Sequence, residues 1–359
     1  MKYIIDKQKG KAYLQIYELI KKDIVNGVYP YNTKLMSKRL LAEETGVSVI
    51  TVEHAYSLLY DEGYIDTRER SGYFVCYNAD STFVAPAKAS TAPSIHTHTA
   101  EHNGDFPFSL YAKTIRRVLS NYGEDIFNSS DGSGSIELKT AIRDYLKRSR
   151  GIEVKTEQIV IGAGSEYLYG LIVQMLGKNR IYALEDPSYQ KIGQVYRANG
   201  VKALFLPLLN DGISSEHLQK TPATVLHITP YRSYPSRITA SASKKNEYIR
   251  WARKDNRIIV EDDFESEFTL LKKAEETVFS MSGGKNVIYV NTFSKTVSPS
   301  VRAAYMLLPE DMVEIYQKNV GFYSCSVPYF NQLILAEFIS GGDFERHINR
   351  VRRKRRRNQ

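Results

Sequence analysis

The chain has 359 residues, of which 42% are hydrophobic and 25% charged, so it is longer than one hydrophobic core usually serves and two domains are expected. Its net charge of +9 comes mostly from a basic run near the C-terminus, residues 346–357, which is typical of a solvated helix face or a disordered end. No apolar run approaches the roughly 20 residues of a transmembrane helix, and the N-terminus MKYIIDKQKG has no signal-peptide pattern. We therefore expect a cytoplasmic protein without a membrane partner.

Residues 1–76 predict three helices followed by a short hairpin. In the first helix, residues recur at helical spacing, namely Leu14, Tyr17, Ile20, Ile24 and Val25. The second helix is predicted between the cap Ser37 and Gly46, and the third between the cap Ser48 and Gly63. Two short capped helices around a glycine turn are typical of a helix-turn-helix, and the strand-like pieces in YIDTRERSGYFV predict a wing.

Residues 77–104 predict a flexible linker, because they are rich in Ala, Ser, Thr and Pro and lack apolar periodicity. His96 and His98 lie in this segment and His102 lies close by, but without a scaffold to hold them we predict no metal site. The only cysteines, Cys76 and Cys325, form no zinc or redox motif and are expected to be reduced thiols.

Residues 105–359 alternate β-branched runs with amphipathic segments, which predicts an α/β domain with a largely parallel sheet. Most of these runs end in polar or glycine-containing clusters. Open sheets of this class bind ligands at the carboxyl ends of their strands.

The whole pattern resembles the MocR subfamily of GntR-type regulators, in which a winged helix-turn-helix is fused to a fold-type-I aminotransferase-like domain. In the first domain the resemblance depends on LMSKRLLAEETGVSVITVEHAYSLLYDEGYIDTRERSGYFV, and in the second on DGSGSIELKTAIRDYL, EDPSYQ, VEDDFESEF and NTFSKTVSPSVRAAYMLLP. It implies a double-stranded DNA operator as partner, pyridoxal 5'-phosphate as cofactor and a homodimer.

A recognition helix places its N-terminal residues in the major groove. The positions at which the family contacts DNA are occupied here by Arg39, Ser48, Thr51, Arg68, Arg70 and Gly72. Ser48 can also act simply as a helix cap, and Arg39 as a surface charge. Where relatives often carry basic residues, this sequence has Val49, Ile50 and Glu53, so phosphate contacts are expected to be fewer.

Pyridoxal phosphate needs an amine, a carboxylate for its ring nitrogen and groups that bind its phosphate. The resemblance assigns the Schiff-base position to Lys295 and the carboxylate to Asp262. The remaining cofactor positions are Gly164, Ser165, Tyr189, Thr292 and Arg302. Gly164 and Ser165 open a helix, whose backbone amides can cradle an anion, while Tyr189 is either a ring-stacking residue or a buried structural one.

Two features depart from the family pattern. Phe264 stands where relatives commonly carry a tyrosine, and Arg232, Ser233 and Arg237 replace the usual His, Gln and Gly of the preceding loop. Family members also continue beyond the equivalent of RHINRVRRKRRR into a small subdomain with an arginine for a substrate carboxylate. We therefore expect this subdomain to be lacking in the present sequence, and Arg232 or Arg237 to be candidates to replace its arginine.

Three functions follow as alternatives. The first is a regulator that responds to the cofactor or to an amino compound bound with it, and the second is a transaminase with an accessory DNA-binding domain. The third is a degenerate regulator that binds DNA without an effector. We favour the first, because the helix-turn-helix pattern is complete while the transaminase pattern is not.

Overall fold

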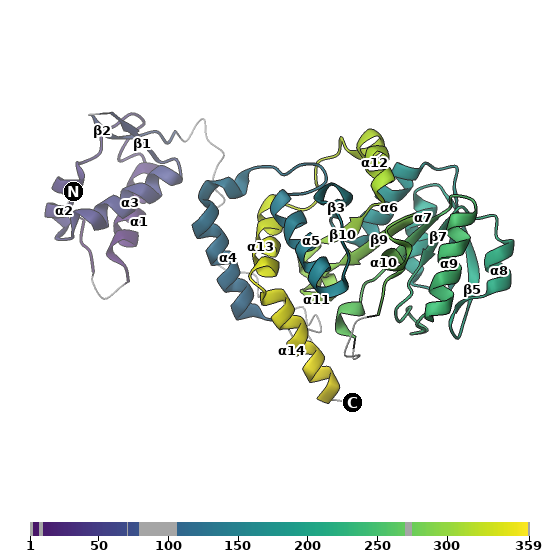
Figure 1. Cartoon of the computed structure of the whole chain (residues 1–359). Coiled ribbons are helices and arrows are strands. Elements are labelled where there is room, and N and C mark those ends of the chain that lie inside the picture. Colours follow the sequence, from purple (N-terminus) through teal and green to yellow (C-terminus); the bar gives the residue numbers. More distant parts are fainter. Residues whose placement is uncertain (1–2, 7–9, 70, 79–105, 270–274, 358–359) are drawn as a thin grey trace. The chain divides into compact units, whose positions relative to one another are not determined.

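The computed structural model describes residues 3–6, 10–69, 71–78, 106–269 and 275–357, and the chain divides into two compact units, Met1–His98 and Thr99–Gln359 (Figure 1). Most of the predicted linker 77–104 lies outside the described residues, as do His96, His98 and His102. The domain boundaries at 76 and 105 therefore stay predictions. No helix in the described ranges is long and apolar enough to cross a membrane.

The first unit contains three helices and a two-stranded antiparallel sheet. Its elements are α1 (Ala12–Val25), α2 (Lys38–Thr45), α3 (Val49–Asp61), β1 (Ile65–Arg68) and β2 (Gly72–Val75). From α1, the core receives Ile16, Tyr17, Ile20 and Ile24. The predicted helix is confirmed, but Leu14 and Val25 are 42% and 47% exposed, and Ile16 belongs to the buried face instead.

Local capping explains the turn between α2 and α3. The Ser37 hydroxyl accepts from the Leu40 amide at the start of α2, and Gly46 ends that helix in the left-handed conformation with φ of 66°. Ser48 caps α3 by accepting from the Thr51 amide at 3.1 Å. These caps satisfy backbone groups that the helix ends leave free, so the helix-turn-helix is specified largely by local sequence.

The second unit is an α/β domain. Its strands are β3 (Ile159–Gly162), β4 (Ile181–Asp186), β5 (Lys202–Leu209), β6 (Gly212–Ile213), β7 (Val225–Ile228), β8 (Ile258–Asp262), β9 (Val287–Thr292) and β10 (Ala304–Leu307). Its α-helices are α4 (Phe108–Tyr122), α5 (Ile136–Arg150), α6 (Ser165–Leu176), α7 (Gln190–Ala198), α8 (Ser215–Lys220), α9 (Ala242–Lys254), α10 (Val278–Ser282), α11 (Phe293–Thr296), α12 (Val313–Val320), α13 (Tyr329–Ser340) and α14 (Asp343–Arg357). Short 3-10 helices, η1 (Gly123–Phe127), η2 (Thr156–Gln158), η3 (Ser266–Phe268), η4 (Pro299–Val301) and η5 (Glu310–Met312), join some of them.

The eight strands form one sheet in the order β3-β10-β9-β8-β7-β4-β5-β6. The central pairs β9–β8, β8–β7, β7–β4 and β4–β5 are parallel, which confirms the predicted α/β class. β10 runs antiparallel to both β3 and β9, and β6 runs antiparallel to β5. The central strands are buried on both faces, as their continuous apolar runs require.

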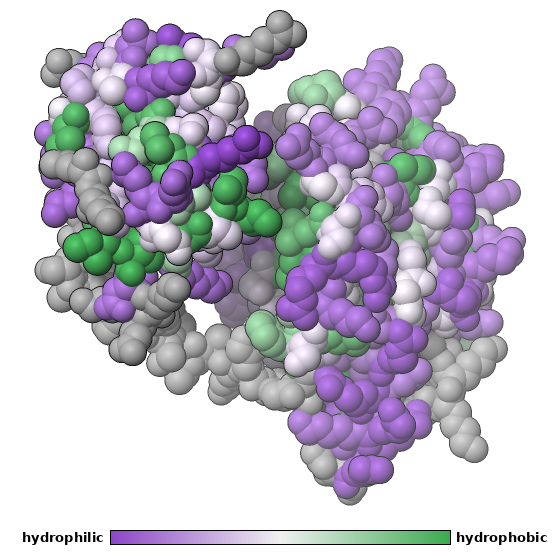
Figure 2. Space-filling model, turned by 90° about the vertical axis from the view of Figure 1, so that its left-hand side faces the viewer, coloured by the Kyte–Doolittle hydropathy of each residue, from purple (hydrophilic) through white to green (hydrophobic). Residues whose placement is uncertain are grey.

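Two hydrophobic clusters cover the two faces of this sheet. One cluster takes side chains from α5, α9, α10, α13 and α14, and the other takes them from α6, α7 and α12. The basic run 346–357 belongs to α14, whose apolar side, including Phe344, Ile348 and Val351, is buried. The helix-face interpretation of that run therefore holds, and hydrophilic residues cover the lower end of the larger unit where α14 ends (Figure 2).

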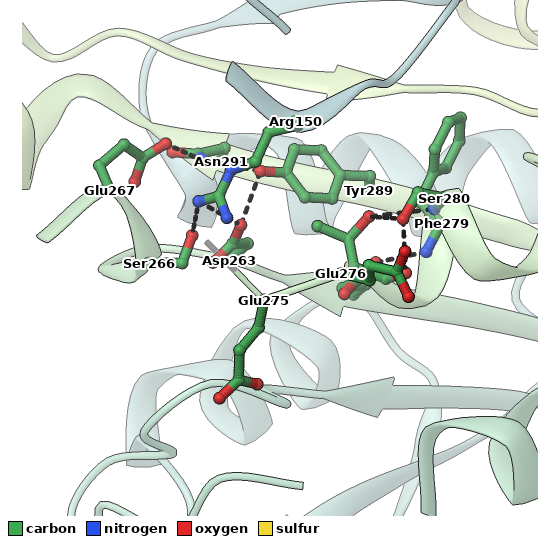
Figure 3. A network of polar contacts seen from close by, with 12 residues as sticks. Arg150, Asp263, Ser266, Glu267, Glu275, Glu276, Phe279, Ser280, Tyr289 and Asn291 are labelled. Atoms are coloured by element: carbon green, nitrogen blue, oxygen red, sulfur yellow. Dashed lines mark hydrogen bonds and ion pairs between the residues drawn. The ribbon is translucent and has the colours of Figure 1, made fainter. Parts of the chain in front are cut away.

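A buried polar network holds the chain beyond the end of β8 (Figure 3). Arg150, at the end of α5, lies 3.5 Å from the Asp263 carboxylate and donates to the Ser266 hydroxyl. The Tyr289 hydroxyl donates to Asp263 at 2.8 Å, and the Asn291 amide donates to Glu267 at 2.7 Å. The side chains of Arg150 and Asp263 are both only 4% exposed, so each charge depends on the other.

We expect Arg150→Met to destabilise the second unit by about 3–5 kcal/mol, because it leaves the Asp263 carboxylate buried without its cation. Arg148→Met is the matched control, since Arg148 is on the same helix but 54% exposed in its pair with Glu345 and should contribute about 0–1 kcal/mol. Urea unfolding followed by the fluorescence of Trp251, the single tryptophan, measures both. Equal losses of stability would contradict this assignment of the network.

Candidate functional site

One cavity of about 480 Å³ lies at the carboxyl edge of the central strands. All seven residues predicted from the cofactor pattern line it, namely Gly164, Ser165, Tyr189, Asp262, Thr292, Lys295 and Arg302. They come from the ends of β8 and β9 and from the starts of α6, α7, α11 and β10. The fold thus brings together residues that are up to 138 positions apart in the chain, from 164 to 302.

One end of the cavity is built to receive an anion. Gly164 precedes α6 with φ of 97° and ψ of 163°, a conformation that residues with a Cβ rarely adopt. The N–H groups of the first turn of α6 have no partners within the helix, and the positive end of the helix dipole lies at this start. A Cβ built on Gly164 would lie 3.7 Å from the guanidinium carbon of Arg302, so the guanidinium and this helix start are adjacent.

The cavity also holds two unpaired cationic groups. Lys295 is exposed on α11, and Arg302 is exposed with a left-handed backbone, φ of 48°, immediately before β10. Among the described residues neither has an ion-pair partner, whereas Lys191, on the same cavity wall, pairs with Glu166 at 3.1 Å. An amine and a guanidinium without protein partners are available to a ligand.

Asp262 is the buried acceptor of the site. Its side chain is 7% exposed, and burial raises the pKa of the carboxyl to about 7. The Tyr169 hydroxyl donates to Oδ2 at 2.5 Å, while Oδ1 is buried without a hydrogen-bond partner. A buried carboxylate oxygen without a partner suits the ring nitrogen of pyridoxal phosphate. The same cavity has an amine and an anion-binding end, so the residues present fit this cofactor.

The aromatic residues of the rim have distinct positions. Tyr189 is 40% exposed and lies edge-on to Tyr234, with ring centroids 6.2 Å apart, so Tyr189 is not the buried structural residue that was the alternative. Phe264 lines the cavity and brings no hydroxyl to it. Arg232 and Arg237, in left-handed conformations, are absent from the described lining, so the structure does not bring them to the cavity.

Sequence reasoning missed several lining or supporting residues, among them Tyr169, Thr229 and His227. Tyr169 stands four residues after Ser165, a helical spacing that could have placed both on one face of α6. Thr229 follows β7, and its amide donates to the buried Glu185 at 3.1 Å. His227 lies behind Asp262 in a buried strand, where nothing in its local sequence distinguishes it from a core residue.

The predicted DNA-binding residues of the first unit lie largely on its surface. Arg39 and Ser48 are exposed, and Thr51 is half-buried with its hydroxyl 2.8 Å from that of Ser48. In the wing, Arg68 is exposed, donates to Asn32 and stacks over Phe74 at 4.2 Å. Gly72 opens β2 with φ of 109°. Arg70 lies outside the described residues.

An ion pair links the two helices of the helix-turn-helix. Lys38 at the start of α2 lies 2.5 Å from Glu53 in the second turn of α3, and the side chains are 31% and 53% exposed. The acidic residue that departs from the family pattern therefore neutralises a neighbouring lysine. Val49 and Ile50, at 40% and 64% exposed, present apolar groups at the same helix start.

Comparisons with known proteins agree with both units. Residues 12–75 match the bacterial regulatory proteins of the gntR family, and residues 102–359 match aminotransferase class I and II. The HTH-type transcriptional regulator YdeL of Bacillus subtilis is 32% identical over 95% of this chain and 76% of its own length. The chain belongs to the MocR-type regulators of the gntR family. The probable rhizopine catabolism regulatory protein MocR of Rhizobium meliloti is 28% identical over 94% of this chain and 74% of its own.

Solved structures similar to this MocR-type regulator include several aminotransferases. They include the multiple substrate aminotransferase of Thermococcus profundus, with a TM-score of 0.63 and 20% identity over 79% of this chain and 76% of that chain. The kynurenine aminotransferase of Pyrococcus horikoshii has a TM-score of 0.62 and 22% identity over 71% of this chain and 66% of that chain. At these identities the likeness establishes the fold, which is the fold-type-I fold expected from the sequence.

The Lys38–Glu53 pair generates a prediction for this MocR-type regulator. We expect Glu53→Gln to strengthen binding to random-sequence duplex DNA, because it removes a negative charge and releases Lys38 for a phosphate. The slope of log K against log salt should become steeper by about 0.9. Glu62→Gln is the control, since Glu62 pairs with Lys21 at the far end of α3. A salt slope unchanged by Glu53→Gln would mean that this surface does not meet DNA.

Proposed function

We propose that the protein is a cytoplasmic, homodimeric transcription regulator whose second unit binds pyridoxal 5'-phosphate and responds to that cofactor or to an amino compound bound with it. The observation that carries this proposal is the cavity in which a free amine, a free guanidinium and the orphaned Oδ1 of Asp262 lie together. It occurs in a chain that also carries a gntR-family DNA-binding unit.

The cofactor would supply an aldehyde that condenses with an amine and an electron-withdrawing ring whose nitrogen carries a proton. Lys295 would provide the amine, and Asp262 would accept a hydrogen bond from the protonated ring nitrogen. The start of α6 at Gly164 and Ser165, the hydroxyl of Thr292 and the guanidinium of Arg302 would bind the phosphate, since all of them line the cavity. Tyr189, on the exposed rim, would stack against the ring.

The proposed DNA face consists of the start of α3, the preceding helix and the wing, with Arg39, Ser48, Thr51, Arg68, Arg70 and Gly72 as contacts. Ser48 caps α3, and its exposed place at the helix start also allows a contact with DNA, so its two interpretations are compatible. The exposed Val49 and Ile50 suit thymine methyl groups better than phosphates. The regulator therefore gains specificity from apolar base contacts where relatives gain affinity from charge.

A regulatory role is favoured over transamination by the composition of the cavity wall. Within the described residues Arg302 is the single guanidinium that lines the cavity, and it lies at the end assigned to the phosphate. A substrate carboxylate entering the site would lose water without gaining a bidentate partner, which costs about 2–5 kcal/mol. An effector that binds the DNA-binding state and the non-binding state of the protein with different affinities can still shift the equilibrium between them.

We expect Lys295→Ala to abolish the visible absorbance band that the protein acquires with pyridoxal phosphate, because the amine that binds the aldehyde is gone. Lys191→Ala is the matched control, since Lys191 lines the same cavity but is paired with Glu166, and it should keep the band. Borohydride reduction followed by peptide mapping locates the attachment. Recovery of the pyridoxyl group on Lys191 or another lysine would contradict the assignment.

The enzyme alternative is tested on the same cofactor-loaded protein. Amino acids are added singly, and both keto-acid release and binding to an operator selected from a random duplex library are measured. We expect altered DNA affinity with at least one amino compound and no stoichiometric keto acid. Rapid keto-acid release with unchanged DNA affinity would favour the transaminase, and neither response would favour the degenerate regulator.

A further inference from the structure

We propose that Tyr169, supported by His227 and Tyr196, is the positioning residue that keeps Asp262 a charged acceptor for the ring nitrogen of the cofactor. This inference rests on the proposed function and deepens it. It concerns three side chains that the sequence pattern did not identify: Tyr169 lines the cavity, whereas His227 and Tyr196 are absent from its described lining.

Tyr169 makes the one direct hydrogen bond to the Asp262 carboxylate among the described residues. Its hydroxyl donates to Oδ2 at 2.5 Å, and the side chain is buried at 2% exposed. This hydrogen bond holds the carboxylate through Oδ2. The second oxygen, Oδ1, has no hydrogen-bond partner among the described residues and is left for a ligand. Burial, followed by the charge of Asp262, raises the pKa of the Tyr169 phenol well above its usual value, so the phenol remains a donor.

His227 and Tyr196 complete the wall behind the carboxylate. The Tyr196 hydroxyl shares a hydrogen bond of 2.8 Å with His227 Nδ1, and this bond orients the imidazole. Nε2 lies 3.9 Å from Asp262 Oδ2. Burial lowers the pKa of His227 to about 3, so the imidazole beside the carboxylate is neutral and adds no charge of its own.

The other titratable groups near Asp262 oppose its charge. Burial is the main cause that raises its pKa, and the neighbouring carboxylate of Asp263 adds to the rise. Glu185, which is fully buried, is a further acidic neighbour whose own pKa is raised by burial and by Asp262. Donation from Tyr169 is the interaction that lowers the pKa of Asp262. Without it, Asp262 takes up a proton more readily and holds a ring nitrogen in its neutral form.

Helix α6 connects this wall to the phosphate end. Ser165 begins the helix, and Tyr169 follows one turn later on the same face, about 6 Å along the axis. Both residues line the cavity. A single rigid element therefore sets the separation between the phosphate site and the carboxylate that receives the ring nitrogen.

The test is Tyr169→Phe in the full chain loaded with pyridoxal phosphate labelled with ¹⁵N in the ring. The wild-type protein should give the NMR shift of a protonated ring nitrogen, and the variant should shift toward the neutral pyridine value. Affinity for the cofactor should fall about 10- to 100-fold, the effect of losing a hydrogen bond to a charged group. Tyr182→Phe is the matched control, because the Tyr182 hydroxyl is buried without a partner and its ring packs on Tyr196 at 4.5 Å.

A second variant, Tyr196→Phe, removes the hydroxyl that bonds His227 Nδ1 and should move the ¹⁵N signal in the same direction by a smaller amount. A protonated nitrogen in Tyr169→Phe, or an equal shift in Tyr182→Phe, would overturn the inference while leaving the proposed function intact. If Tyr169→Phe does not fold, the Tyr196→Phe signal decides, and no shift there rejects the inference. Wild-type protein that binds no pyridoxal phosphate would overturn the proposed function and this inference together.

Discussion

The antiparallel strand β10 is the constraint on which the site depends. It lies between β3 and β9, and Ala304 pairs with both Gly162 at the end of β3 and Thr292 at the end of β9. Because β10 runs in the opposite direction, its start lies at the edge where the other two strands finish. Arg302, two residues before that pairing, is therefore placed beside Gly164 and the start of α6. A parallel strand in this place would put the guanidinium at the opposite edge of the sheet.

Several buried carboxylates lie at the same edge of the sheet, and each has different hydrogen-bond or ion-pair partners. Glu261 accepts the amides of Val278 and Phe279 at the start of α10, both at 2.7 Å. Glu185 is bound by the amide of Thr229 and the hydroxyl of Ser233. Asp263 has Arg150 and Tyr289 (Figure 3).

Asp262 differs from these carboxylates, because one of its two oxygens has no hydrogen-bond partner while facing a cavity. Buried acidic groups are costly unless they are hydrogen-bonded, so the others serve to fix the loops beyond the strands. In the function that we propose, Asp262 is the carboxylate that receives a ligand. The rigid surroundings supplied by the neighbouring groups keep that single open oxygen in place.

The sequence by itself determined the elements whose signals are local. The caps Ser37 and Ser48, the glycine turn at Gly46 and the uninterrupted apolar strands depend on neighbouring residues, so the helix-turn-helix and the α/β class could be read directly. The family resemblance, over several separate stretches, named seven residues that meet in one cavity. Tertiary structure alone decided the contacts between distant segments. Tyr169 and Asp262 are 93 positions apart, and Lys38 and Glu53 lie on two different helices. No spacing pattern in the sequence indicates that the members of either pair are in contact. It also decided that Ile16, and not Leu14, enters the core, because the direction of a helix face is set by what packs against it.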